Sequence, residues 1–161
     1  MTAKRRVVIT GLGAVTPFGI GTDKFWNSLV EGKSGISTSE LIDVSKHVVK
    51  ISGEVKNFNP DEYLDPKEAK KMDRFMQFAM IAADEAIKDA KLEEVNDVDP
   101  YKIGVVVSSA AGGFRTFEEN HIRILEKGPN KCSPFTIPMM IVNMASGRIS
   151  MKYGFKGINK V

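Results

Sequence analysis

Two short β-branched runs, each followed by a glycine-rich segment and then by a helical pattern, constrain the fold most. The first run is residues 7–10 (Val-Val-Ile-Thr), and the second is residues 103–107 (Ile-Gly-Val-Val-Val). Short apolar runs of this kind are typical of buried strands. Because strands that alternate with helices form sheets through β-α-β crossovers, the sequence predicts an α/β protein.

Helical spacing of apolar residues predicts the helices between and after these strands. The clearest pattern runs from about residue 66 to residue 91 as one helix, with Pro66 suited to its first turn. Residues 48–55 have partial strand character. The other predicted helices are one that begins at Thr22 or Asp23 and ends before Gly32, one through Phe117, Ile122 and Leu125, and one over residues 138–153.

Composition excludes several classes of protein. The chain has 161 residues, which predicts a single domain, and its net charge of +3 does not indicate a nucleic-acid binder. It contains one cysteine, so no disulfide forms within the chain and a reducing compartment is favoured. No window has the apolar length of a membrane span, and the start lacks the pattern of a signal peptide. We therefore expect a cytoplasmic protein that binds neither nucleic acid nor a membrane.

The first glycine-rich segment, Gly11-Leu12-Gly13, has two interpretations. After a strand, such glycines cradle the pyrophosphate of a dinucleotide. Here Thr16 stands in place of the third glycine, and Pro17 interferes with a helix that would begin at the turn. The sequence therefore favours a tight structural turn over a nucleotide site.

The second glycine-rich segment, residues 108–113 (Ser-Ser-Ala-Ala-Gly-Gly), also leaves two alternatives. Ligands of α/β proteins gather at the carboxyl ends of strands, and small side chains let a substrate come close. The same small side chains equally allow a neighbouring element to pack against the segment. No Gly-x-Ser-x-Gly elbow is present to make a serine nucleophile.

A basic cluster lies at the start of the predicted long helix. It consists of Lys67, Lys70, Lys71 and Arg74, which share one side of the first turns. Such a cluster attracts an acidic partner. From spacing alone, however, a solvated face is the favoured interpretation.

The remaining reactive side chains do not form a recognisable site. His47 and His121 have no cysteine or second histidine at metal-ligand spacing, so no metal is expected. Cys132 lies in a predicted loop where only Lys131 would lower its pKa, and we do not expect it to be catalytic.

Several stretches, in chain order, resemble the β-ketoacyl-acyl-carrier-protein synthases, most closely the type II long-chain condensing enzymes of bacteria. The residues that carry this resemblance are 7–19, 25–26 with 29–36, 71–75, 118–120, 133–135 with 141–144, and 153–157. Each motif alone is weak, whereas the ordered set covers nearly the whole chain.

The resemblance implies a thiolase-like fold, of which residues 1–161 would form most of the first βαβαβαββ half of a homodimeric enzyme. The family transfers an acyl group from carrier protein to a cysteine and then condenses it with decarboxylated malonyl-carrier protein. It needs no cofactor. Its cysteine sits just after a turn like residues 154–157, and its two histidines follow later, so all three are expected beyond Val161. We therefore expect the chain to be an inactive fragment, ending on entry to a new strand.

The resemblance also assigns roles to residues within the chain. It places Ala111, Gly112, Gly113, Phe135, Thr136 and Ile137 at the acyl pocket, with Ala111 where an isoleucine gate is common. It matches Lys67, Lys70 and Lys71, with Arg74 as a weaker candidate, to the surface that binds acidic acyl carrier protein. This reverses the interpretation of the basic cluster as a solvated face.

Two other functions remain open. The first is a non-catalytic ketosynthase-like partner subunit of the chain-length-factor type found in polyketide systems, which the residue just beyond Val161 would distinguish. The second is a thiolase-fold enzyme acting on coenzyme A thioesters, against which the basic cluster and residues 133–135 argue.

Overall fold

The computed structural model describes residues 4–95 and 97–161, which form two compact units of mixed helix and strand. The first comprises the described parts of Met1–Lys56 and Ala82–Asn96, and the second comprises Asn57–Ile81 and Asp97–Val161. The predicted domain covers residues 1–161, and the structure describes all of these except residues 1–3 and 96. Among the described residues, none of the helices is both long and apolar enough to cross a membrane.

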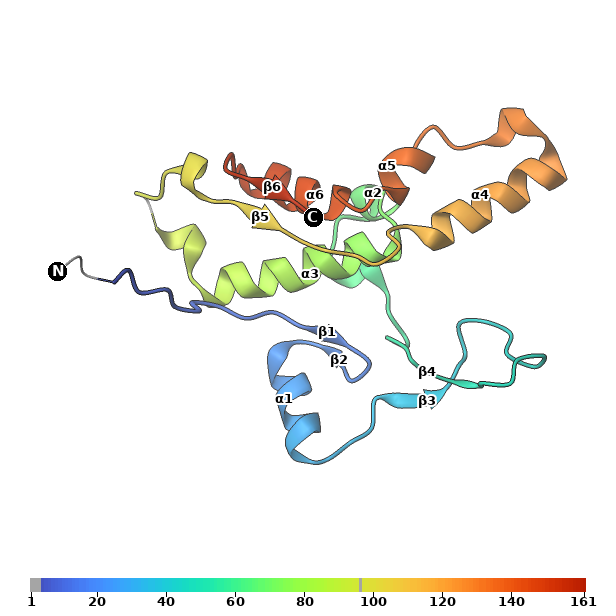
Figure 1. Cartoon of the computed structure of the whole chain (residues 1–161), viewed down its shortest axis with the longest axis horizontal. Coiled ribbons are helices and arrows are strands. Elements are labelled where there is room, and N and C mark those ends of the chain that lie inside the picture. The colour runs from blue at the N-terminus through green and yellow to red at the C-terminus, as the bar shows by residue number, and fades with distance from the viewer. Residues whose placement is uncertain (1–3, 96) are drawn as a thin grey trace. The chain divides into compact units, whose positions relative to one another are not determined.

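The first unit contains two small antiparallel pairs of strands. Strand β1 (Val15–Thr16) pairs with β2 (Gly19–Ile20) in a tight hairpin that leads into helix α1 (Thr22–Val30) (Figure 1). Strand β3 (Ile36–Thr38) pairs with β4 (Ile51–Gly53), the part of residues 48–55 that becomes a strand. The second half of helix α3 (Arg74–Asp89) also belongs to this unit.

The second unit is built around a parallel pair of strands. Strand β5 (Val105–Val106) runs parallel to β6 (Asn159–Lys160), and helix α6 (Met144–Tyr153) contacts both (Figure 1). Helices lie between the two strands in the chain, as the predicted crossover requires. The helices of this unit are α2 (Pro66–Ala69), the first half of α3, α4 (Phe114–Lys127), α5 (Thr136–Met140) and α6 (Met144–Tyr153).

The core of the second unit gathers methionines and small residues from α2, α3 and α6. Met76 and Ser146 are fully buried, and Ala145 has no exposed surface either. The Ser146 Oγ lies 2.8 Å from Asn159 Oδ1, and Asn159 Nδ2 donates to Ser150 Oγ at 2.8 Å. These bonds attach β6 to α6. The other buried apolar residues of this unit are Leu64, Ala69, Met72, Met80, Ile81, Val105 and Ile149.

The prediction of a buried strand at residues 7–10 is wrong. These residues have no regular structure, and Val7 and Ile9 are 90% and 82% exposed. A strand needs a neighbour to satisfy its backbone groups, and none of the strands among the described residues pairs with this run.

The segment Gly11-Leu12-Gly13 is not the predicted tight turn. The chain reverses later, at the β1–β2 hairpin that includes Thr16 and Pro17, and both glycines pack directly against α3. A Cβ on Gly13 would lie 1.9 Å from the Ala82 carbonyl oxygen, which explains why the position is glycine. The nearby amides are already used, because Ala14 N donates to Glu85 Oε2 at 2.9 Å and Leu12 N donates to Asp89 Oδ2 at 2.9 Å. They do not form a phosphate cradle.

Both long predicted helices are interrupted. Residues 66–91 form α2 and α3, because the Asp73 side chain caps a new helix through Phe75 N (3.3 Å). Residues 138–153 belong to α5, which begins earlier at Thr136, and to α6. Ile141 adopts an extended backbone (φ −70°, ψ 137°) between them, and the Met140 carbonyl accepts a hydrogen bond from Gly113 N instead (2.9 Å). A local cap thus starts α3, whereas a tertiary contact marks the end of α5.

Candidate functional site

Two exposed lysines lie at helix α2, Lys67 within it and Lys70 directly after it. Asp65 caps the helix, since its Oδ1 accepts from Lys67 N (2.9 Å) and Glu68 N (3.0 Å). At the other end, Gln77 Nε2 donates to the carbonyl oxygens of Ala69 (3.0 Å) and Met72 (3.3 Å). The side chains of Lys67 and Lys70 are exposed and make no ion pair within the described residues.

The other two members of the predicted basic cluster are engaged within the protein. Lys71 is paired with Glu68 at 2.7 Å, and Glu68 also binds Arg148 at 2.9 Å. The hydrogen bond from Lys71 lowers the pKa of Glu68 below its ordinary value, and Arg148 acts in the same direction. Glu68 therefore stays charged and neutralises part of the cluster.

Arg74 lies against two aromatic rings. Its guanidinium carbon is 5.0 Å from the Phe58 ring centroid and 4.9 Å from that of Phe78, and these rings meet edge to face at 4.9 Å. Such cation–π contacts favour a fixed position for the guanidinium. Because α3 begins only at Arg74, this residue does not continue the surface of α2 as the sequence predicted.

A cavity of about 450 Å³ adjoins α2. Its apolar lining comes from α3, α6 and the segment before α2, with charged groups that include the Glu68–Arg148 ion pair. The lining residues are Tyr63, Leu64, Asp65, Glu68, Met72, Met80, Arg148, Met151 and Lys152.

The small-residue segment before α4 packs against α5. Gly112 has φ +63°, which only glycine adopts readily, and a Cβ on it would lie 2.3 Å from the Met140 carbonyl oxygen. A Cβ on Gly113 would lie 2.3 Å from the Met139 carbonyl oxygen. Of the two alternatives left open by the sequence, close packing therefore accounts for both glycines. Ala111 is exposed.

The other predicted pocket residues lie at the start of α5, with Phe135 directly before the helix. Phe135 is 46% exposed and Ile137 is 58% exposed, whereas Thr136 is half-buried and donates from Oγ1 to the Ser133 carbonyl at 2.7 Å. The structure thus brings the α5 segment beside Gly112 and Gly113. None of the six predicted pocket residues lines either cavity described in this section.

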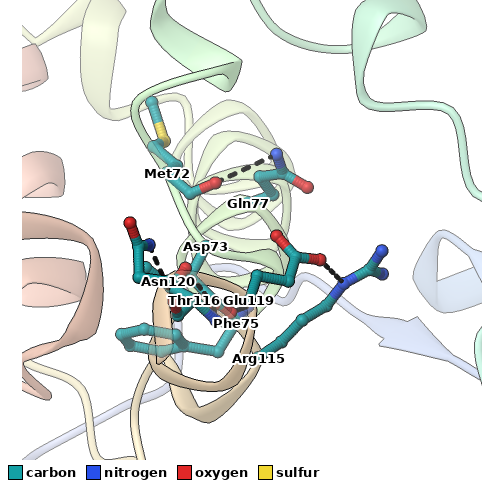
Figure 2. Close-up of polar contacts among 8 residues, drawn as sticks. All are labelled: Met72, Asp73, Phe75, Gln77, Arg115, Thr116, Glu119 and Asn120. Carbon is teal, nitrogen blue, oxygen red and sulfur yellow. Dashed lines mark hydrogen bonds and ion pairs between the residues drawn. The ribbon is translucent and has the colours of Figure 1, made fainter. Parts of the chain in front are cut away.

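Asp73, Thr116 and Asn120 form a buried polar node, a group of hydrogen-bonded side chains that joins these segments. The sequence analysis did not predict this node. Figure 2 shows Asp73 beside the first turn of α4, with Thr116 and Asn120. Asp73 Oδ2 accepts from Thr116 N at 3.0 Å and from Thr116 Oγ1 at 2.6 Å. Asn120 Nδ2 donates to the Thr116 carbonyl (2.9 Å), and its Oδ1 accepts from Ser133 N (3.2 Å). An aspartate just before a helical run is a capping signal, which could have revealed part of this node.

A second, polar cavity of about 280 Å³ lies beside the node. Arg115 lies on its wall and donates to Glu119 at 2.7 Å, and this bond raises the pKa of Arg115 (Figure 2). The lining residues are Phe58, Pro60, Met72, Asp73, Arg74, Gln77, Arg115, Thr116, Glu119 and Met139.

The histidines and the cysteine are not among the residues that line either cavity, although Cys132 Sγ lies 3.6 Å from Thr136 Oγ1. His47 and Cys132 are exposed, and the exposed His121 stacks on the Phe117 ring at 6.2 Å. Among residues 4–95 and 97–161, no group of three or more His, Cys, Asp or Glu side chains is placed to hold a metal ion.

Comparison with known proteins finds a family and close relatives. The profile of the family described as "Beta-ketoacyl synthase, N-terminal domain" matches residues 4–161. A protein of Synechocystis sp. named 3-oxoacyl-[acyl-carrier-protein] synthase 2 is 47% identical over 97% of this chain and 37% of its own length. A protein of the same name from Staphylococcus aureus is 45% identical over 99% of this chain and 38% of its length. The chain thus spans well under half of these relatives.

Solved structures share the fold. The ishigamide ketosynthase/chain length factor superposes with a TM-score of 0.87 at 25% identity, over 99% of this chain and 40% of that one. A β-ketoacyl synthase from Burkholderia phymatum superposes with a TM-score of 0.74 at 21% identity, over 97% of this chain and 39% of that one. A type II polyketide synthase structure, of a ketosynthase in complex with its acyl-carrier protein, has a TM-score of 0.75 at 23% identity over 95% of this chain and 41% of that one. The predicted α/β, thiolase-like fold is confirmed.

Proposed function

Because the chain belongs to the β-ketoacyl synthase family, we propose that it forms part of a condensing enzyme that elongates fatty acyl chains by two carbons. The observation that carries this proposal is the 47% identity to a 3-oxoacyl-[acyl-carrier-protein] synthase 2 over 97% of the chain. In the proposed reaction an acyl group passes from the carrier thiol to an enzyme cysteine. Malonyl-carrier protein then loses CO₂, its carbanion attacks the thioester carbonyl, and the cysteine leaves.

The cysteine and two histidines of this reaction are expected beyond Val161, and no cofactor is required. Within the chain we assign two supporting roles. Lys67 and Lys70 attract acidic carrier protein, supported by their exposure within and directly after a capped helix. Lys71 contributes less because Glu68 already binds it, and Arg74 contributes least because it lies against two rings. The ketosynthase neighbour solved with its acyl-carrier protein is consistent with such a partner.

The second role is the wall of the acyl pocket, formed by the segment before α4 and by α5. Gly112 and Gly113 pack against α5 by backbone contact, which brings the two segments together. Their exposed neighbours Ala111, Phe135 and Ile137 are free to meet an acyl chain or the rest of the enzyme. Thr136 holds the turn between them through Ser133.

A chimaera tests the proposed function. Residues 4–161 would replace the matching part of the Staphylococcus aureus relative, and the rest of that relative is expected to supply the cysteine and histidines. We expect the chimaera to form β-ketoacyl product from acyl- and malonyl-carrier protein, detected by mass spectrometry. The 161-residue chain alone should form none, because removal of catalytic groups costs orders of magnitude in rate. A folded chimaera without any product would contradict the proposal, as would product formed by the chain alone.

The similarity to the ishigamide ketosynthase/chain length factor supports a second candidate function. In this alternative the chain belongs to a non-catalytic subunit that pairs with an active ketosynthase. The codons that follow Val161 in the gene separate the two functions. A cysteine shortly after the turn at residues 154–157 supports the enzyme, and any other residue there supports the partner subunit.

We further propose that the complete protein is a cytoplasmic homodimer. Helix α4 buries polar residues, Thr116 and Asn120, and exposes apolar ones. Phe114, Phe117 and Leu125 are 65%, 50% and 72% exposed. A helix with its apolar side outward needs a cover, and a second copy of the chain supplies one.

Charge on this outer side should prevent dimer formation. In the chimaera, Phe117→Lys combined with Leu125→Lys should convert dimers to monomers, measured by light scattering over a range of concentrations. Glu126→Lys is the control, since it adds positive charge to the same helix about 100° around the axis from Leu125. A double variant that remains as dimeric as the control would contradict this interface.

A further inference from the structure

We propose that Asp73 is a positioning residue, whose single carboxylate caps two helices and thereby sets the wall of the acyl pocket. The proposal deepens the function proposed above and rests on it. It starts from the burial of the group, since Asp73 is 7% exposed and Thr116 is 5% exposed. Both side chains are buried, and burial strengthens the hydrogen bonds between them.

The two carboxylate oxygens of Asp73 accept hydrogen bonds from two different helices. Oδ1 accepts from Phe75 N (3.3 Å) in the first turn of α3. Oδ2 accepts from Thr116 N and Thr116 Oγ1 in the first turn of α4 (Figure 2). Helix α4 has no cap of its own, because the residue before it, Gly113, has no side chain. Asp73 thus supplies from α3 the negative group that the amino terminus of α4 needs.

The node continues from α4 to both proposed pocket segments. Gly113 directly precedes α4 and donates from its backbone N to the Met140 carbonyl at the end of α5. One turn along α4, Asn120 links the Thr116 carbonyl to Ser133 N, just before Phe135. The segments that carry Ala111 and Phe135 are therefore both attached to the turn that Asp73 holds.

The fit leaves little freedom for Asp73 to move independently. A Cβ on Gly113 would lie 3.1 Å from Asp73 Oδ2, so the carboxylate lies close to the glycine. A change in the carboxylate is therefore passed to Gly113 by direct packing and to Ser133 by hydrogen bonds. Pocket walls held to within about 0.5 Å decide which substrates fit well, so a small shift should alter acyl-chain selectivity.

Two variants of the node and two controls test the proposal. Asp73→Asn keeps the size of the side chain but directs an N–H at one of the helix donors, and Thr116→Val removes only the hydroxyl. Thr116→Ser restores the hydroxyl donor. Asp99→Asn is the matched control, because Asp99 accepts from Tyr101 N (3.0 Å) and caps only the exposed 3₁₀ turn Pro100–Lys102.

The first measurement is hydrogen exchange on the 161-residue chain, which does not depend on activity. Asp73→Asn and Thr116→Val should raise amide exchange at Gly113, Thr116 and Ser133 by about tenfold or more, the equivalent of 1.4 kcal/mol. Thr116→Ser and Asp99→Asn should leave these amides unchanged. Equal exchange in all variants would overturn the proposed node, whether or not the chain belongs to a condensing enzyme.

The second measurement is kcat/KM of the chimaera with short and long acyl primers. In Asp73→Asn and Thr116→Val the ratio between the two primers should change by about three- to tenfold, which is near the value of one buried methylene. Thr116→Ser should restore the original ratio. A purely structural role would lower both values equally and leave the ratio unchanged, and that result would overturn the positioning role. A wild-type chimaera that is folded but inactive would instead count against the proposed function.

Discussion

Gly113→Ala should destabilise the chain by about 3 kcal/mol, whereas Gly147→Ala should stabilise it by about 0.5–1 kcal/mol. The added Cβ at position 113 would lie 2.3 Å from the Met139 carbonyl oxygen and 2.8 Å from Met140 Cα. Both are backbone atoms that cannot rotate away. At position 147, within α6, nothing lies within 4 Å of the added atom. There the change only removes conformational freedom from the unfolded chain.

Urea denaturation followed by circular dichroism measures both effects on the same chain. The pair is informative because the substitution is identical and only the surroundings differ. If Gly113→Ala were as stable as the unchanged chain, the close contact between the segment before α4 and α5 would be wrong. If Gly147→Ala were equally destabilising, the open space beside α6 would be wrong.

Charge reversal of Lys67 and Lys70 should produce the largest functional effect. We expect Lys67→Glu with Lys70→Glu to raise the KM of the chimaera for acyl-carrier protein roughly tenfold or more, since each exposed ion pair contributes up to about 1 kcal/mol and reversal adds repulsion. The difference should shrink as salt is added, because the charges are exposed and screened. Lys71→Glu alone should matter less, because Glu68 already neutralises Lys71.

The small thioester acyl-pantetheine separates docking from folding. It lacks the acidic surface of carrier protein, so the double variant should use it almost normally. Lys46→Glu with Lys102→Glu is the control, since it changes net charge equally at two exposed lysines elsewhere. Equal losses with both substrates would mean that the lysines support the fold. No loss with either substrate would mean that carrier protein docks elsewhere.

For the basic cluster, residue spacing predicted a shared helix but not the surroundings of each side chain. The spacing of Lys67, Lys70, Lys71 and Arg74 placed all four on one helix, and the resemblance gave them one partner. The helix ends at Ala69 and a new one begins at Arg74, so the four side chains have different surroundings. Ion pairing and ring contacts, which no spacing rule reveals, leave Lys67 and Lys70 as the exposed members.

The sequence by itself determined the family, the α/β class and the positions of α1 and α4. These follow from local patterns, such as the apolar repeat of each helix, and from ordered motifs that relatives share. Family membership did not require coordinates, because it rests on identity along the chain.

Only the tertiary structure decided where helices break, why the glycines are needed and what holds α4. Asp73 and Thr116 are separated by 43 positions, and Gly13 and Ala82 lie still further apart in the sequence, so no local pattern links either pair. The run at residues 7–10 has every local feature of a strand, yet none of the described strands pairs with it. Strands, helix ends and buried carboxylates depend on partners supplied by distant parts of the chain, and only the folded arrangement brings those partners together.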